Sequence, residues 1–199
     1  MSDKPEELSV QSSQNEQELS SDAKQPMAPK NIAEQTEHVV DTPQSRLEQL
    51  VEQLKHDIAE DVVDEAVINE VNGQLPTITI KKEHWLATAR WFQLEEEWSC
   101  DYLRNLAGVD QGDELEVVYH LISLQTRREI AVHVKTEREQ PWIPSVTPLW
   151  PTANWNEREV YDLLGIDFPG HPDLRRIMMP DDWVGHPLRK DYDPSDSEV

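Results

Sequence analysis

Residues 115–136, LEVVYHLISLQTRREIAVHVKT, are the stretch that decides the fold. They contain two apolar segments, 115–124 and 129–136, separated by residues 125–128, which fit a tight turn. Apolar residues recur at every second position of the second segment, which is the period of a strand with one buried face: Ile130, Val132 and Val134. The stretch therefore predicts two consecutive strands of a sheet.

The segment before this stretch begins with a helix signal. Thr42 and Pro43 fit an N-cap and a first helical residue, because proline has no backbone N–H to lose at that position. The apolar residues that follow have helical spacing and form one stripe: Leu47, Leu50, Val51, Leu54 and Ile58. We expect an amphipathic helix that begins at residue 43.

Between this helix and the opening stretch, the pattern changes to strands and a second helix. Val63, Val67 and Val71 share one parity, and Asn72-Gly73 is a hairpin turn signal. Residues 75–80 are the return strand, with Pro76 at its start or on a sheet edge. A helix over 82–94 and an apolar segment over 98–106 complete the order. The prediction is an α+β fold: a mixed β-sheet with helices packed on one face, followed by an extended proline-rich C-terminal arm.

Composition divides the 199 residues into four parts. Residues 1–42 are polar and acidic without an apolar period, so we expect a disordered N-terminal tail. Residues 43–140 form the α+β core domain, 141–192 form a short helix and an extended docking arm, and 193–199 form an acidic C-terminal tail.

Charge and cysteine content exclude several classes of function. A net charge of −22 argues against nucleic-acid binding, which needs clustered basic residues. No apolar run reaches the ~20 residues that span a bilayer, and the first residues fit neither a signal nor a transit peptide, so we expect a cytosolic chain. Cys100 is the only cysteine, so neither an internal disulfide nor a four-thiolate iron–sulfur cluster can form within the chain.

A short helix precedes the arm. Asn154 is expected to cap it, with Glu157 three positions later completing a capping-box pair, and Gly165 is placed to end it in the left-handed conformation. Beyond Gly165 five prolines forbid a long helix or a central strand: Pro169, Pro172, Pro180, Pro187 and Pro194. This part of the chain is therefore extended or rich in turns.

Two sets of residues around this helix could carry chemistry. Glu157, Glu159 and Asp162 are candidate acid/base carboxylates, but nothing nearby supplies a nucleophile, and ion pairing explains them more simply; Arg158 lies four residues before Asp162. The candidate metal ligands are His171, Asp173, Asp181, Asp182 and His186, whose spacing matches no compact ligand motif. Turn or contact roles are the preferred interpretation for this second set.

The basic pairs of the arm favour docking on a partner. Arg175-Arg176 and Arg189-Lys190 alternate with apolar residues, and arginine tolerates desolvation at interfaces while pairing with carboxylates. The apolar anchors between them are Leu174, Ile177, Met178, Met179, Trp183 and Leu188. Arg127-Arg128 is a separate case, a charged hairpin tip that we interpret as mainly solvated, with a partner contact as the alternative.

The chain resembles the 30 kDa-type subunit of the proton-pumping NADH:quinone oxidoreductase, respiratory complex I. The resemblance covers roughly 43–192 and rests on three motifs: Pro144-Ser-Val146 with Trp150 and Glu157-Arg-Glu159, Gly170-His-Pro-Asp-Leu-Arg-Arg176, and Pro187-Leu-Arg-Lys-Asp-Tyr192. It implies a scaffold of the peripheral arm without catalytic residues or cofactor. FMN and iron–sulfur clusters would lie in partner subunits, and the large quinone-pocket subunit and cluster-bearing subunits would be its neighbours.

The resemblance also implies a location and a set of partner-binding residues. The location is the cytoplasmic side of a bacterial cell membrane, reached through partner subunits. The partner-binding residues are Glu157, Arg158, Glu159, Asp162, His171, Arg175, Arg176, Trp183, Arg189 and Lys190. Two alternatives stay open: the equivalent subunit of a membrane-bound hydrogenase or other-donor dehydrogenase, and a stand-alone metal-dependent hydrolase.

Overall fold

Five strands form one mixed sheet in the computed structural model, which describes residues 42–193. The elements are α1 (Pro43–Asp57), β1 (Val63–Asn69), β2 (Leu75–Lys81), α2 (Lys82–Leu94), β3 (Tyr102–Asp110), β4 (Glu114–Ile122), β5 (Glu129–Glu137) and α3 (Ala153–Leu164). The strand order is β1-β2-β5-β4-β3, and only the central β2–β5 pair is parallel. The predicted α+β fold with a mixed sheet is confirmed. The predicted tails lie outside the described residues, apart from Thr42 and Asp193.

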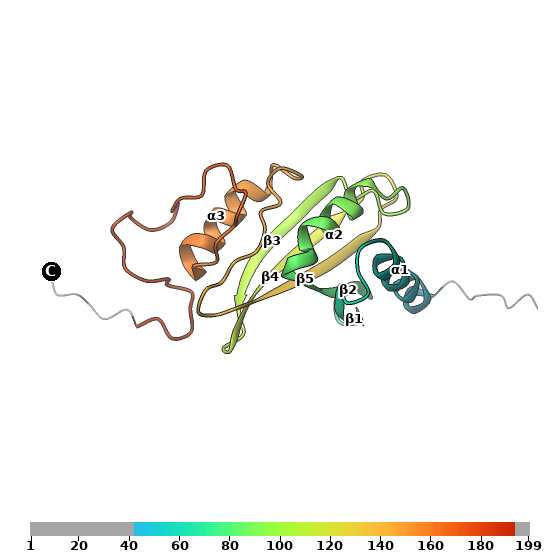
Figure 1. Ribbon diagram of the computed structural model, residues 1–199, viewed down its shortest axis with the longest axis horizontal. Coiled ribbons are helices and arrows are strands. Elements are labelled where there is room, and N and C mark those ends of the chain that lie inside the picture. Colours follow the sequence, from blue (N-terminus) through green and yellow to red (C-terminus); the bar gives the residue numbers. More distant parts are fainter. Residues whose placement is uncertain (1–41, 194–199) are drawn as a thin grey trace, which may run out of the picture. The chain divides into compact units, whose positions relative to one another are not determined.

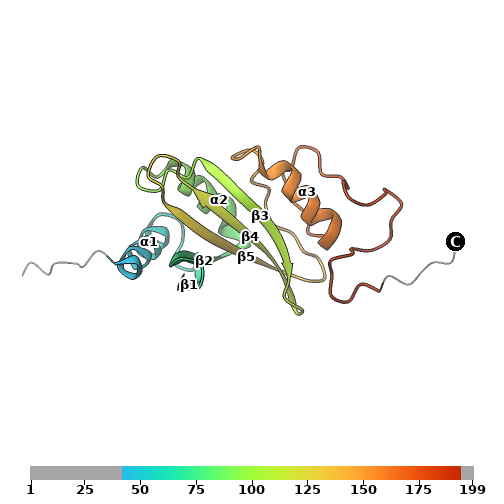
Figure 2. The same cartoon turned by 180° about the vertical axis from the view of Figure 1, so that it is seen from behind.

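One face of the sheet holds the core. The alternating residues of β4 and β5 point into it, and these are fully buried: Leu115, Val117, Tyr119, Leu121, Ile130, Val132 and Val134. The helices lie over this face (Figure 1), as the sequence predicted, and Figure 2 shows the sheet from behind, where none of the described helices covers it. The alternation of residues 115–136 thus places every helix on the same side.

Helix α1 begins where the sequence predicts. The Thr42 hydroxyl accepts a hydrogen bond from the backbone N–H of Ser45, and Pro43 occupies the first turn. Leu47, Leu50 and Leu54 are buried, so the predicted apolar stripe faces the sheet.

The hairpin β1–β2 is confirmed, but the three valines that share one parity do not lie on one face, since Val63 packs against the core and the other two do not. Val67 and Val71 are 43 % and 100 % exposed, while Ala66 and Ile68 pack against the core. The pairing register shifts between Val63 and Glu65, and a one-residue bulge moves every later side chain to the opposite face. Pro76 lies at the start of β2, as expected.

Strand β3 begins four residues later than the apolar segment 98–106 suggested. Trp98 is buried in the turn after α2, in an edge-to-face contact with Phe92 at 5.6 Å between ring centroids. The apolar residues at the start of that segment therefore fill the core from a turn, and the strand extends instead to Asp110.

Helix α3 lies unusually close to β3 because Gly108 has no side chain. A Cβ at Gly108 would be 2.4 Å from Leu164 Cδ1 and 2.9 Å from Val160 Cγ1. Asn156 and Thr152 donate side-chain hydrogen bonds to the Leu106 and Leu103 carbonyls of β3. Helix and edge strand are therefore joined by both packing and hydrogen bonds, which also protects part of that edge.

The predicted C-terminal end of α3 is confirmed, but the predicted capping box at its N-terminal end is not. Gly165 ends the helix with φ +72°, as predicted. The capping box is wrong, since Asn154 lies inside the helix and Thr152 is the residue before it. Glu157 is turned away from the helix start because it serves as the acceptor for a neighbouring loop, as described below.

Candidate functional site

The arm, residues 166–193, folds back along α3 without forming a helix or a strand of its own (Figure 1). Its first residues pair with the connector that precedes α3. The Ile143 N–H donates to the Asp167 carbonyl and the Asp167 N–H donates to the Pro141 carbonyl, both at 2.9 Å. The Ser145 N–H donates to the Pro169 carbonyl at the same distance. The hydrophobic core accordingly continues beyond residue 140 into both segments.

Asp162 is the main anchor of the arm. Its side chain is completely buried, and its Oδ2 accepts from the consecutive N–H groups of Ile177, Met178 and Met179 at 2.9, 2.7 and 2.9 Å. Its Oδ1 accepts from Arg176 Nη1 at 2.8 Å. Burial acts to raise the pKa of Asp162, but these N–H donors and the guanidinium outweigh burial, so the pKa lies below its ordinary value. The carboxylate is therefore charged and fixes the arm to α3.

Glu157 is a second buried carboxylate, directed at the connector. It accepts from the Ser145 and Thr147 hydroxyls at 2.6 and 3.0 Å and from the Val146 N–H at 2.7 Å. Burial raises the pKa of Glu157 above its ordinary value, although these donors act against that effect. His171 Nε2 lies 4.0 Å from the carboxylate and donates to the Asn154 carbonyl at 3.2 Å. Glu157 thus holds the connector to α3.

A third carboxylate, Asp110 at the end of β3, holds the far part of the arm. It accepts from Arg138 Nη1 at 2.7 Å and from the Lys190 N–H at 2.8 Å, and Arg138 also pairs with Asp191. Hydrogen bonding from Arg138, and then from backbone N–H groups, holds the pKa of Asp110 well below its usual range despite burial. Asp110 and Arg138 were not predicted from the sequence, because no local signal links them to residues about 50–80 positions away.

The arginines of the arm find their acceptors within this chain. Arg175 Nε donates to Asp173 Oδ2 at 2.9 Å, and Arg189 Nε donates to the Leu164 carbonyl at 2.7 Å. Arg158 Nε donates to the Arg175 carbonyl at 3.2 Å, so Asp162 pairs with Arg176 rather than with Arg158. The acceptors seen here belong to this chain, and the predicted pairing of these arginines at a partner interface stays a prediction.

The predicted partner-binding residues therefore fall into two groups. Glu157, Arg158 and Asp162 are buried, and His171, Arg176 and Arg189 are partly exposed. The exposed members are Glu159, Arg175, Trp183 and Lys190. Whether any of them binds a partner stays a prediction. The buried and partly exposed residues shape the arm, and the exposed residues are accessible to other molecules.

Large apolar side chains are exposed on the arm and on α3. We call this set the arm surface; it consists of Trp155, Met178, Trp183, Val184 and Leu188. Val184 is 87 % exposed and Trp155 is 64 % exposed, with the Arg158 guanidinium 4.8 Å from the Trp155 ring. Met178, Trp183 and Leu188 were predicted from the sequence as apolar anchors, whereas Trp155 and Val184 were not. Large apolar side chains that stay exposed on α3 and on a segment fixed by buried carboxylates are suited to contact with a partner protein.

The positions of the carboxylates and histidines around α3 favour neither the acid/base interpretation nor the metal interpretation. Glu159 is exposed while Glu157 and Asp162 are buried in separate hydrogen-bond sets. His186 Nδ1 donates to the Asp162 carbonyl at 3.0 Å, and no cluster of three or more His, Cys, Asp or Glu within residues 42–193 could hold a metal ion. Burial raises the pKa of the Cys100 thiol to about 12, so this thiol is protonated at neutral pH. Of the helices in the described range, none has the length and apolar character needed to cross a membrane.

Comparisons with known proteins agree on one family. Residues 78–198 match the family described as respiratory-chain NADH dehydrogenase, 30 Kd subunit. The chain is 46% identical over 120 residues to an NADH-quinone oxidoreductase subunit of Moorella thermoacetica, covering 59% of this chain and 80% of the relative. It is 48% identical over 124 residues to the subunit of the same name from Chloroherpeton thalassium, covering 61% of this chain and 52% of that relative.

Two solved structures share the fold. A trypsin-resistant fragment (1–134) of Nqo5 has a TM-score of 0.54 and 26% identity, covering 67% of this chain and all of the fragment. A chain of the membrane-bound sulfane sulfur reductase, an archaeal respiratory membrane complex, has a TM-score of 0.58 at 22% identity. The match covers 74% of this chain and 86% of the reductase chain. The second likeness concerns the fold alone. Together with the family match over most of the core and arm, these relatives show that the chain belongs to the 30 kDa subunit family of respiratory-chain NADH dehydrogenase.

Proposed function

We propose that the chain is a scaffold subunit in the peripheral arm of an NADH:quinone oxidoreductase. In such a complex electrons pass from NADH through FMN and iron–sulfur clusters to quinone, and the transfer is coupled to proton translocation. The clusters and FMN would be held by other subunits, and this chain would supply neither catalytic residues nor a cofactor. Support comes from the family and from relatives named as subunits of this enzyme.

The observation that carries the proposal is the arm surface. Buried charges are stabilising only when they are paired, and here Asp162, Glu157 and Asp110 are satisfied by donors from the connector and arm. These contacts fix a segment that has no regular structure, residues 166–193, so its apolar side chains are presented in a defined arrangement. Trp and Met anchors with arginine nearby are the composition of an interface core.

The partners follow from the same proposal. The large quinone-pocket subunit would cover the arm surface, and cluster-bearing subunits would lie beside it. Association with the cytoplasmic side of the cell membrane would then occur through these subunits. The exposed residues Glu159, Arg175, Trp183 and Lys190 are the ones we expect to contact them directly.

A second candidate is the equivalent subunit of a membrane-bound hydrogenase or of a dehydrogenase with another electron donor. The observation that favours it is that the same fold occurs in a chain of a sulfane sulfur reductase complex. The arm surface would serve equally well there, because docking does not depend on the electron donor.

Isolation of the chain from its own cells through an affinity tag tests the proposal. We expect partner subunits to co-purify, with an NADH-binding flavin subunit identified by mass spectrometry and NADH-driven quinone reduction by the purified complex. A complex that lacks that subunit and oxidises hydrogen or another donor would favour the second candidate. A chain recovered alone, or one that carries stoichiometric flavin, cluster or metal after separation from its partners, would contradict the scaffold role.

A further inference from the structure

A groove runs between α3 and β3, the last strand of the sheet. Figures 1 and 2 both place α3 beside this strand. The groove consists of two hollows, of about 360 and about 300 Å³, which meet at three shared lining residues: Asn105, Leu106 and Asn156. The first hollow reaches Tyr102 and Trp155, and the second reaches Glu159 and Leu188. We call the two hollows together the edge groove.

The edge groove is continuous with the arm surface. Trp155 and Leu188 belong to the arm surface, and they line the first and the second hollow respectively. A partner that covers the arm surface along α3 would therefore also cover the groove. The inference below rests on the proposed scaffold role and specifies which chemistry the partner brings to this side.

The edge of β3 presents backbone groups to the groove. The Leu106 carbonyl accepts from Asn156 Nδ2 at 3.0 Å, so it points away from β4. Residues of an antiparallel pair alternate in this respect, so the N–H and C=O of Gly108, which lines the second hollow, point the same way. Among residues 42–193 no hydrogen bond occupies these two groups. Unpaired groups at a strand edge suit a ligand with an extended backbone.

Glu159 gives the second hollow a free carboxylate. Within residues 42–193 its side chain takes part in neither a hydrogen bond nor an ion pair. The apolar residues that line the same hollow are Leu106, Ala107, Val160, Leu163, Leu164 and Leu188. Lys and Arg lay their methylene groups along apolar surface while the charged end stays at the rim, where it can meet a carboxylate. The second hollow therefore suits a long basic side chain, which an acidic chain with a net charge of −22 also attracts.

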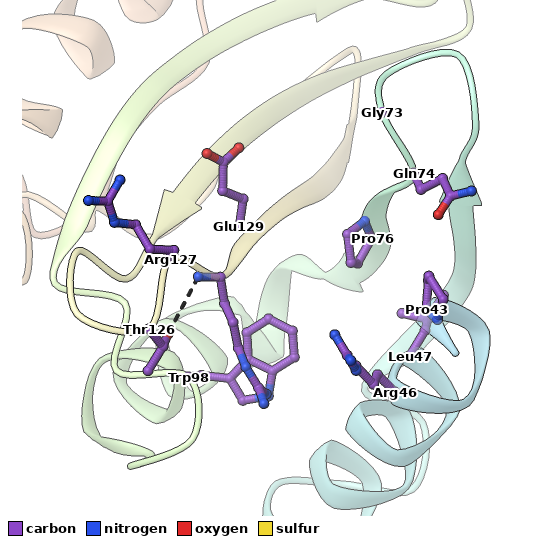
Figure 3. A pocket seen from close by; sticks show the side chains of 11 residues that line it. Pro43, Arg46, Leu47, Gly73, Gln74, Pro76, Trp98, Thr126, Arg127 and Glu129 are labelled. Carbon is purple, nitrogen blue, oxygen red and sulfur yellow. Dashed lines mark hydrogen bonds between the residues drawn. The ribbon is translucent and has the colours of Figure 1, made fainter. Parts of the chain in front are cut away.

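A hollow at the turn between β4 and β5 lacks such a free carboxylate (Figure 3). Its acidic lining residue, Glu129, already accepts from Arg104 Nη1 at 3.1 Å. Arg128 donates to Glu97 at 2.5 Å, and Figure 3 shows the Arg127 side chain directed away from the other lining residues. A partner contact of the Arg127-Arg128 hairpin tip accordingly stays the alternative to a solvated role.

The first hollow suits a large apolar side chain. Tyr102 and Trp155 are 40 % and 64 % exposed, and Arg104 in the same hollow is committed to Glu129. Trp155 and Glu159 are four residues apart on α3, which separates them by about 6 Å. Two residues of an extended chain span about the same distance and point their side chains to the same side. The spacing of the two hollows thus fits residues two positions apart on one strand.

We propose that the edge groove binds an extended segment of a partner subunit that carries a large apolar residue and a Lys or Arg two positions apart. The apolar side chain would lie between Tyr102 and Trp155, and the basic side chain would lie along the second hollow and pair with Glu159. The backbone of the segment would bond with the outward groups of Gly108.

An NMR titration of the full chain with the end-capped peptide Gly-Ser-Phe-Ser-Lys-Ser-Gly tests this proposal. We expect saturable shifts of the amide signals of Leu106, Gly108 and Glu159, and weaker binding as NaCl rises from about 50 to about 300 mM. Glu159→Gln should weaken binding about threefold, as for an exposed ion pair, and Trp155→Ala about tenfold, as for an aromatic anchor. The matched control is Glu52→Gln, at an exposed carboxylate of α1 outside the groove, and should leave the affinity unchanged.

Two control peptides test the charge and the spacing. Replacement of Lys by Glu should abolish binding, and placement of Phe and Lys at adjacent positions should weaken it, because their side chains then point to opposite sides. Glu159→Gln removes no contact made within the described residues, so the variant should keep the thermal midpoint of the parent chain. Absence of saturable shifts, shifts confined to residues outside the groove, equal binding of the Glu peptide, or equal affinity of the parent and Glu159→Gln would overturn the proposal.

The scaffold role is judged separately, by the partner subunits that co-purify with the tagged chain. Recovery of those subunits without peptide binding would overturn the edge-groove proposal and leave the scaffold role standing. A chain recovered alone would contradict the scaffold role whatever the peptide result.

Discussion

Replacement of Asp162 should release the arm from α3 without unfolding the sheet. The Asp162 carboxylate accepts four hydrogen bonds, three from the N–H groups of Ile177, Met178 and Met179 and one from Arg176. Asp162→Ala removes all four acceptor contacts and leaves the guanidinium without its buried partner. Asp162→Asn keeps one oxygen for the N–H groups but turns an amide toward the guanidinium.

The size of the effect follows from these contacts. Breaking a buried, hydrogen-bonded charge pair by removing one partner costs about 3–5 kcal/mol. Because Met178 is exposed and water reaches the released N–H groups, we expect the lower end for Asp162→Ala, about 3 kcal/mol. At about 1.4 kcal/mol for each factor of ten, the open state of the arm should become about a hundredfold more populated. Asp162→Asn keeps the hydrogen bonds from the backbone N–H groups in weaker form, so it should raise the population of the open state about tenfold.

Amide hydrogen exchange measures this opening directly. The N–H groups of Ile177, Met178 and Met179 should exchange faster by these factors in the two variants, while the amides of β4 and β5 keep their protection. Asp181→Ala, at an exposed carboxylate of the same arm, is the matched control and should leave the three rates unchanged. Equal exchange in Asp162→Ala and the parent chain would refute the anchoring role of Asp162.

Three further predictions concern packing, the second carboxylate and pH. Gly108→Val should lower the free energy of unfolding in urea by about 2 kcal/mol, because the new side chain collides with Leu164 and Val160 of α3. Glu157→Ala should cost about 3 kcal/mol since it leaves three buried donors without an acceptor, whereas Glu157→Gln keeps an acceptor for the Val146 N–H and should cost less than about 1 kcal/mol. The pKa values of Asp110 and Asp162 lie below their ordinary values, so their stabilisation is complete above about pH 4 and is lost as the pH falls through the folded-state pKa values; hydrogen-exchange measurements on the arm from neutral pH into strong acid should show its release.

Each of these predictions has a clear contrary result. An unchanged urea midpoint in Gly108→Val would mean that α3 has room to move away from β3. Equal losses in Glu157→Gln and Glu157→Ala would show that the negative charge matters more than the acceptor. An arm that keeps its full protection in strong acid would show that Asp110 and Asp162 do not hold it.

The sheet could be predicted from the sequence because its signals are local. The alternation through residues 115–136 and the turn at 125–128 determine two strands and their inward face, and Thr42 with Pro43 determines the start of α1. The inward face of β1 could not be predicted in this way. It depends on a bulge after Val63, and the same strand without the bulge would present the opposite side chains to the core.

The site was predictable in location but not in arrangement. The arm and its arginines stood out by composition, yet Asp162 and Glu157 look like surface charges in the sequence, since their donors come from residues more than ten positions away in most cases. Asp110 gave no signal, because its partner Lys190 follows 80 residues later and bonds through the backbone N–H, which nearly every residue possesses. Burial of a charged group is decided by such distant donors, and composition does not reveal them.

The amount of assembled complex, measured beside turnover per assembled complex, tests the scaffold role most directly. Val184→Asp places a charge on the arm surface and, at a residue 87 % exposed, should leave the isolated chain folded. Its matched control is Val71→Asp, at a fully exposed valine of the β1–β2 turn. We predict that Val184→Asp, like Trp183→Ala, reduces the assembled complex while turnover per complex stays within about twofold of the parent. Normal assembly with turnover per complex lowered about a hundredfold would contradict the account, because the arm would then act in the chemical step.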